Sequence, residues 1–168
     1  PATGGFRLEL PGTPELSDES FTEADGTQSI LRTALVETWD GMAFHVSHEE
    51  LPLDSDLSDQ ASILDAMRDG VIESAVLQEG RAITLRGFSG REFVAYDSAR
   101  QLSIAGRVFL IDRKSITLVA ITPGPRTAAH VRAADRFLKS FAIADQRGSE
   151  LAALSLSSQL SAQSSQLR

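Results

Sequence analysis

The dipeptide Asp40-Gly41 restricts the fold more than any other feature of this chain, because it separates two runs of strand-forming residues. Residues 30–39 precede the dipeptide, and residues 42–46 follow it. Asp-Gly between two such runs is the strongest short-range signal for a β-hairpin, since glycine accepts the positive φ of a tight turn. The pattern therefore predicts two antiparallel strands that meet at this turn.

The rest of the sheet is predicted from the same kind of pattern. Acid-rich residues 15–27 and 51–57 are expected to be loops. Alternating apolar and polar residues, or short β-branched and aromatic runs, indicate further strands. These strands are expected at residues 6–10, 82–85, 92–96, 102–111 and 116–121, with turns at 87–90 and 112–115.

A first helix is predicted after the second acidic segment. Ile63, Leu64, Met67, Val71 and Ile72 recur at helical spacing. Either Asp56 or Ser58 is expected to cap its N-terminus, because both side chains accept hydrogen bonds from free backbone N–H groups. Gly70 lies inside this helix and weakens it by about 1 kcal/mol relative to alanine.

A second helix is predicted near residue 127, where Thr127 is a suitable N-cap. Its buried face is expected to carry Val131, Ala134, Leu138 and Phe141. Because the strands come in hairpin pairs, the chain is expected to be an α+β domain with helices on a central antiparallel sheet.

Domain organisation follows from a change in composition near the C-terminus. Residues 148–168 contain mostly Leu, Ala, Ser and Gln, whereas residues 1–147 carry the mixed pattern of a folded domain. We therefore expect one domain over 1–147, followed by a tail or weak helix over 148–168.

Charge and composition exclude several function classes. The 168 residues carry a net charge of −7, which disfavours nucleic-acid binding and docking on anionic lipid. The chain has no cysteine, so disulfides and thiolate nucleophiles are excluded. No apolar stretch approaches the roughly 18 residues that cross a bilayer, so direct membrane insertion is not expected.

The acids gather in runs, and one run is a candidate binding surface. Two interpretations remain open for it: a solvated loop, or an acidic patch that attracts a partner protein. The candidate patch consists of Glu49, Glu50, Asp54, Asp56 and Asp59.

No residue is identified as catalytic, cofactor-binding or metal-binding. The Gly-Phe-Ser-Gly sequence at 87–90 lacks the second glycine of a nucleophile elbow. His45 and His48 differ by three positions, so a regular strand places them on opposite faces. Asp54, Asp56 and Asp59 do not match a calcium loop.

Some other polar and aromatic residues are assigned to structure. Arg91 and Glu92 are expected to form structural ion pairs, with anion binding by Arg91 as the alternative. Arg107 and Arg136 are expected to anchor their strand and helix to neighbouring acids. Trp39 and Tyr96 are expected to pack in the core or on a sheet face.

Four segments together resemble a known fold family. They are residues 6–14 (Phe-x-Leu-x-Leu-Pro-Gly-x-Pro), 87–93 (Gly-Phe-x-Gly-Arg-Glu-Phe), 107–110 (Arg-Val-Phe-Leu) and 136–141 (Arg-Phe-Leu-x-Ser-Phe). Their order and spacing resemble small bacterial domains of the Mog1/PsbP-like fold over residues 6–143. This resemblance implies an α-β-α sandwich around an antiparallel sheet. It also implies a binding or assembly role without a shared catalytic motif.

Three functional hypotheses follow. The first is a non-enzymatic module that binds or assembles with another protein. The second is a small-ligand carrier, with an apolar cleft between the sheet and the first helix. The third is a hydrolase whose catalytic residues are dispersed in the sequence. The resemblance is consistent with a cell-envelope or periplasmic location if a leader has been removed, and a cytoplasmic location is the alternative.

Overall fold

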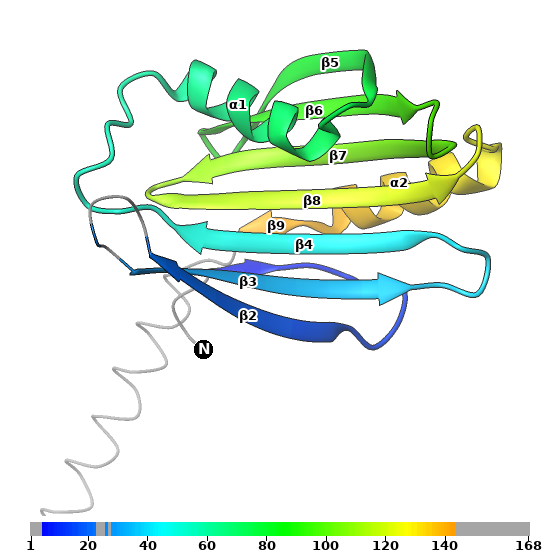
Figure 1. Ribbon diagram of the computed structural model, residues 1–168, viewed down its shortest axis with the longest axis horizontal. Helices are drawn as coiled ribbons and strands as arrows, with labels where there is room; N and C mark the ends of the chain where they lie inside the picture. Colours follow the sequence, from blue (N-terminus) through cyan, green and yellow to red (C-terminus); the bar gives the residue numbers. More distant parts are fainter. Residues whose placement is uncertain (1–4, 23–25, 27, 144–168) are drawn as a thin grey trace, which may run out of the picture. The chain divides into compact units, whose positions relative to one another are not determined.

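Seven strands form one fully antiparallel sheet in the order β2-β3-β4-β8-β7-β6-β5 (Figure 1). The computed structural model describes residues 5–22, 26 and 28–143. The sheet strands are β2 (Glu15–Thr22), β3 (Gln28–Glu37), β4 (Ala43–Glu50), β5 (Val76–Leu85), β6 (Phe88–Asp97), β7 (Leu102–Ile111) and β8 (Lys114–Pro123).

Two helices cover opposite faces of this sheet, as Figure 1 shows. Helix α1 (Gln60–Ile72) packs on β6 and β7, and α2 (Ala128–Ser140) packs on β8 and β7. Arg91 and Glu92 are neighbours in β6 and therefore point to opposite faces. Arg91 contacts α1, whereas Glu92 contacts Arg107, which also bonds to α2. The expected α-β-α sandwich is therefore confirmed.

Each face of the sheet has its own apolar core. On the α1 face, Leu64 is fully buried among side chains that include Val108 and Leu110 of β7. On the α2 face, the ring of Phe44 in β4 meets the ring of Phe137 edge-on, with centroids 5.2 Å apart. Burial of such side chains contributes roughly 1.5–3 kcal/mol each and holds both helices on the sheet.

The predicted hairpin at Asp40-Gly41 is confirmed, since β3 pairs with β4 in antiparallel register. Its loop is longer than a two-residue turn. The N–H groups of Thr38 and Gly41 donate to the carbonyls of Met42 and Thr38 at 2.9 Å. Gly41 has φ +80°, the left-handed conformation that closes a three-residue loop.

Strand β2 corrects the expectation of a loop over residues 15–27. All of Glu15–Thr22 pairs with β3, and every residue of β2 is exposed. Because β2 lies at the edge of the sheet, its acids remain solvated, and charges there discourage pairing with another chain. An acid-rich sequence is therefore compatible with a strand at this place.

The predicted N-cap of the first helix was wrong, and that of the second helix is confirmed. Helix α1 is capped by Asp59 and not by Asp56 or Ser58: the Asp59 carboxylate accepts from the Ser62 N–H at 3.1 Å. Thr127 caps α2 as predicted, because its hydroxyl accepts from the His130 N–H at 3.2 Å.

Several strand boundaries also differ from the prediction. Strand β5 begins at Val76 rather than residue 82. The turn before β6 consists of Arg86 and Gly87, at φ +51° and +89°, so Phe88 already belongs to the strand. Residues 87–90 are therefore mostly strand, and the predicted turn there is displaced toward the N-terminus.

A second, two-stranded antiparallel sheet consists of β1 (Phe6–Arg7) and β9 (Ala142–Ile143). The rings of Phe6 and Phe141 lie 5.6 Å apart between their centroids. The predicted tail, 148–168, lies outside the described residues. No helix in the described part of the chain has the length and apolarity needed to cross a membrane.

Candidate functional site

An open cleft of about 400 Å³ lies between helix α1 and the sheet. Because α1 packs on β6 and β7, it leaves the same face of β8 and β4 only partly covered. We call this space the α1 cleft. Its lining residues are His45, Ser47, Met67, Gly70, Val71, Ile104, Thr117, Val119 and Ile121.

The polar side chains of the α1 cleft come from two paired strands. In the β4–β8 register, Ser47 is opposite Thr117 and His45 is opposite Val119. Alternation along the strands directs all of these side chains to the α1 face. The cleft therefore has hydrogen-bonding groups at β4 and β8, beside apolar surface from α1 and β7.

The electrostatics of the cleft favour an uncharged occupant. None of its lining residues is an acid, a lysine or an arginine. Burial lowers the pKa of His45 below its ordinary value, so its imidazole is neutral at pH 7. A neutral imidazole offers one N–H donor and one acceptor nitrogen. His45, Ser47 and Thr117 can thus exchange hydrogen bonds with a neutral polar group.

Gly70 lines the cleft from the interior of α1. Glycine there lowers helix stability, yet no close packing contact compensates for it. A Cβ built at residue 70 would have no neighbouring atom within 4 Å. The missing side chain therefore leaves space along the α1 side of the cleft.

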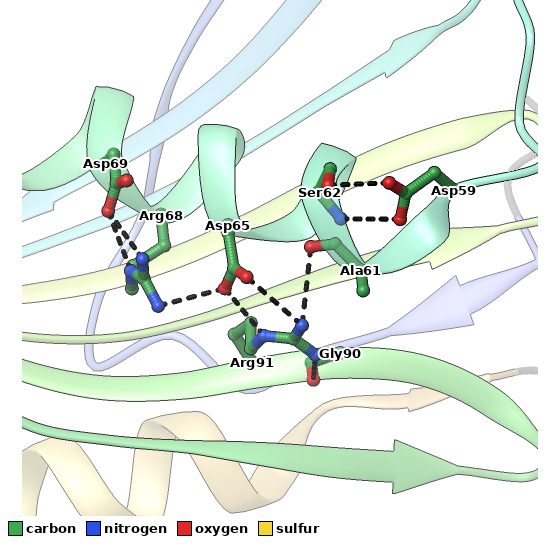
Figure 2. A network of polar contacts seen from close by, with 8 residues as sticks. All are labelled: Asp59, Ala61, Ser62, Asp65, Arg68, Asp69, Gly90 and Arg91. Atoms are coloured by element: carbon green, nitrogen blue, oxygen red, sulfur yellow. Dashed lines mark hydrogen bonds and ion pairs between the residues drawn. The ribbon is translucent and has the colours of Figure 1, made fainter.

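A polar network fixes α1 over β6 and so positions the cleft (Figure 2). Nε of Arg91 in β6 donates to Oδ1 of Asp65 in α1 at 2.8 Å, and Nη2 donates to the Ala61 carbonyl at 3.3 Å. Arg68 also donates to Asp65, at 2.9 Å. The hydrogen bond from Arg91 is the main cause that lowers the pKa of Asp65.

A second hollow, of about 340 Å³, lies beside Arg81 and Glu92. Nε of Arg81 lies 2.8 Å from one carboxylate oxygen of Glu92, and Nε of Arg107 lies 2.6 Å from the other. Burial raises the pKa of Glu92, but the bonds from the two arginines outweigh this effect and leave it lowered. Both oxygens are therefore engaged in structural pairing.

The five acids of the candidate patch lie at the end of β4 and in the segment that leads to α1. Asp56 accepts from the Ser58 N–H at 2.9 Å, and Asp59 caps α1. The bond from the Ser58 N–H lowers the pKa of Asp56, and bonds from the Ser62 hydroxyl and N–H lower the pKa of Asp59. Glu50 and Asp54 are exposed, and Glu49 is half-buried. Two of the five acids thus serve the local backbone.

The three histidines are dispersed. His45 lines the α1 cleft, while His48 lies on the opposite face, as their odd spacing predicts. Nδ1 of His130 lies 3.5 Å from the Thr127 N–H at the start of α2. Within residues 5–22, 26 and 28–143, no three His, Asp or Glu side chains are placed to hold a metal ion.

The sequence prediction located some of these residues and missed others. It placed Met67 and Val71 on the packed face of the helix, where they line the cleft. It assigned no role to Ser47 or Thr117, because nothing in the sequence shows that β4 pairs with β8. The one available signal was Gly70, an unexplained glycine inside a helix.

Trp39 and Tyr96, both predicted to pack in the core or on a sheet face, differ in their burial. Tyr96 is half-buried in β6, and its hydroxyl donates to the Gln101 side chain at 3.0 Å. Trp39 is 99% exposed, so the expectation that it packs in the core or on a sheet face was wrong. Its place in the loop, rather than in the strand, explains this exposure.

Comparisons with known proteins show the fold. Neither a protein-family profile nor a curated protein sequence matches this chain. The crystal structure of LpqN, "involved in cell envelope biogenesis of Mycobacterium tuberculosis", is similar, with a TM-score of 0.55 and 18% identity over 86% of this chain and 87% of that chain. The solution structure of PsbP from Synechocystis sp. PCC 6803 has a TM-score of 0.49 and 15% identity, over 80% and 97% of the two chains. The similarity to LpqN confirms that this chain has the Mog1/PsbP-like fold.

Proposed function

We propose that this chain is a non-enzymatic binding module and that the α1 cleft is its ligand site. The observation that carries the proposal is the open, amphipathic cleft of about 400 Å³, whose wall is widened by Gly70. Small-molecule sites typically have volumes of roughly 300–1,000 Å³ and combine apolar walls with a few polar groups. The small-ligand hypothesis from the sequence fits this geometry best.

The lining also defines the class of ligand. Met67, Val71 and Ile104 offer an apolar surface, while His45 and Thr117 offer hydrogen bonds on the other side. A charged group would lose its hydration in this cleft without gaining a charged partner. We therefore expect a small, mostly apolar molecule that carries an uncharged hydroxyl, ester or amide group.

A fluorescent probe tests this proposal. N-phenyl-1-naphthylamine is apolar, uncharged at neutral pH and carries one N–H group, so it matches the expected class. We expect its fluorescence to rise on binding to the wild-type chain. Gly70→Leu should weaken binding by about tenfold or more, because it adds a side chain at the cleft wall.

Ala66→Leu is the matched control, because residue 66 is exposed on the same helix and does not line the cleft. This variant should bind the probe like the wild type. Absence of binding to the wild type, or equal binding by the Gly70→Leu variant, would exclude the cleft as the ligand site.

Protein binding through the acidic patch is a second candidate function. The exposure of Glu50 and Asp54, on a chain with a net charge of −7, favours it. Lysine at both positions should slow association with a partner recovered by affinity capture, because charge complementarity increases association rates. An unchanged association rate would exclude the patch as a binding surface.

A further inference from the structure

Trp39 is the only tryptophan of the chain, and it is 99% exposed at the tip of the β3–β4 hairpin. An indole in this position contributes almost no burial to the stability of the fold. Tryptophan is also among the residues most enriched at the energetic centres of protein interfaces. The side chain thus has the chemistry of an anchor for another molecule.

The loop holds Trp39 in a defined position. Hydrogen bonds of 2.9 Å between Thr38 and Met42, and between Gly41 and Thr38, close the loop on both sides of the tryptophan. The Thr38 hydroxyl lies within hydrogen-bond reach of both the Asp40 carboxylate and the Met42 carbonyl. Met42 is itself buried, with 2% exposure. A preorganised loop loses little conformational entropy when it binds.

The charged residues next to Trp39 in the sequence are acidic. Glu37 and Asp40 are both exposed, and residues 33–44 contain no lysine, arginine or histidine. The hydrogen bond from the Thr38 side chain is the main cause that lowers the pKa of Asp40, so this carboxylate stays ionised at pH 7. Trp39 therefore has a carboxylate two residues before it and one residue after it, and His130 at the start of α2 also acts on Asp40.

We propose that the hairpin tip, defined as residues 37–41, binds a partner protein that offers an apolar pocket ringed by lysine or arginine side chains. The indole of Trp39 fills the pocket, and Glu37 and Asp40 face the basic ring. A lipid surface fits less well, because two acids would approach the headgroups together with one aromatic residue. A second copy of this chain fits less well, because its α1 cleft has no basic lining residue.

Selection from a phage library of random peptides tests this proposal, because it requires no identified partner. The bait is the full-length chain, and the Trp39→Ala variant is used for counter-selection. We expect the selected peptides to combine large apolar residues with Lys or Arg. Their binding should be at least about tenfold weaker with Trp39→Ala. It should be several-fold weaker with Asp40→Asn, which keeps the shape of the side chain but removes its charge.

Leu53→Ala is the matched control, because Leu53 is also highly exposed, at 91%, but lies in a different loop. It should leave peptide binding unchanged, and Trp39→Ala should leave the melting temperature unchanged. The proposal is overturned if no peptides are selected, if they lack basic residues, or if they bind the Trp39→Ala variant equally well.

The fluorescence of Trp39 tests the two other possible partners, a lipid surface and a second copy of the chain. A blue shift on addition of phosphatidylcholine vesicles would overturn the proposal and identify a lipid surface as the binding partner of Trp39. A blue shift that depends only on protein concentration would overturn the proposal and identify a second copy of the chain as the partner. We expect neither shift.

Discussion

Nε of Arg91 lies 2.8 Å from Oδ1 of Asp65, and this contact joins the sheet to helix α1. The same guanidinium also donates to the Ala61 carbonyl in the first turn of the helix. These bonds hold α1 over β6. The position of the α1 cleft thus depends on a polar contact as well as on apolar packing.

Arg91→Met should loosen α1 while most of the sheet remains intact. The substitution keeps an apolar stem but removes the hydrogen bonds to α1, and it leaves the Asp65 carboxylate without its main donor. We expect faster amide hydrogen exchange in residues 64–72 and a lower melting temperature. Arg68→Met is the control, because Arg68 bonds to Asp65 and Asp69 within α1. Equal exchange in the two variants would contradict this explanation.

Gly70→Ala should increase stability, unlike most substitutions of an internal glycine. A methyl group at residue 70 has no neighbour within 4 Å, and alanine favours the helix by about 1 kcal/mol. We expect the melting temperature to rise by roughly 2–4 °C.

Gly106→Ala is the contrasting variant, because a Cβ there would lie 2.5 Å from Cζ of Phe93. Overpacking of this kind typically lowers stability by about 1–3 kcal/mol. If Gly70→Ala also lost stability, the added methyl group would be in contact with neighbouring atoms. Residue 70 would then not widen the cleft.

The fold was largely predictable because local signals agreed with it. Asp40-Gly41 marked the β3–β4 hairpin, and the run 102–111 coincides with β7. Strand β2 was missed because an edge strand buries no side chain and shows no apolar face. Trp39 was misplaced because its residue type favours strands, whereas its place in the loop decides its exposure.

The cleft was predictable only in outline. An apolar site between the first helix and the sheet was one of three hypotheses, and Gly70 stood out as a weak point in the helix. The residues that line the cleft could not be deduced, because His45 and Val119 become neighbours only through the β4–β8 pairing. That pairing joins strands far apart in the sequence, and it depends on the order of the whole sheet.

His45 should make the protein less stable at acid pH. Burial lowers its pKa in the folded state, so between this value and about 6.5 the unfolded chain binds more protons than the folded one. Stability therefore is complete above about pH 6.5 and decreases as the pH falls through that interval. His45→Gln should show a smaller decrease in the urea midpoint between pH 7 and pH 5. The same slope in both proteins would show that His45 does not titrate with folding.

Glu92→Gln should lower stability at neutral pH and have a smaller effect at acid pH. The Glu92 carboxylate accepts charged hydrogen bonds from Arg81 and Arg107, and their loss should cost about 1–3 kcal/mol. Because the folded-state pKa of Glu92 is lowered, this contribution is complete above about pH 4.3 and is lost as the pH falls through the folded-state value. Urea unfolding at pH 7 and at successively lower pH values measures the difference, which should shrink with acidification.

Glu79→Gln, at an exposed neighbour in β5, should change stability by less than about 0.5 kcal/mol. If the difference in stability between Glu92→Gln and the wild type did not change with pH, the charge of Glu92 would not be the source of its contribution. The arginines would then stabilise the side chain through uncharged contacts.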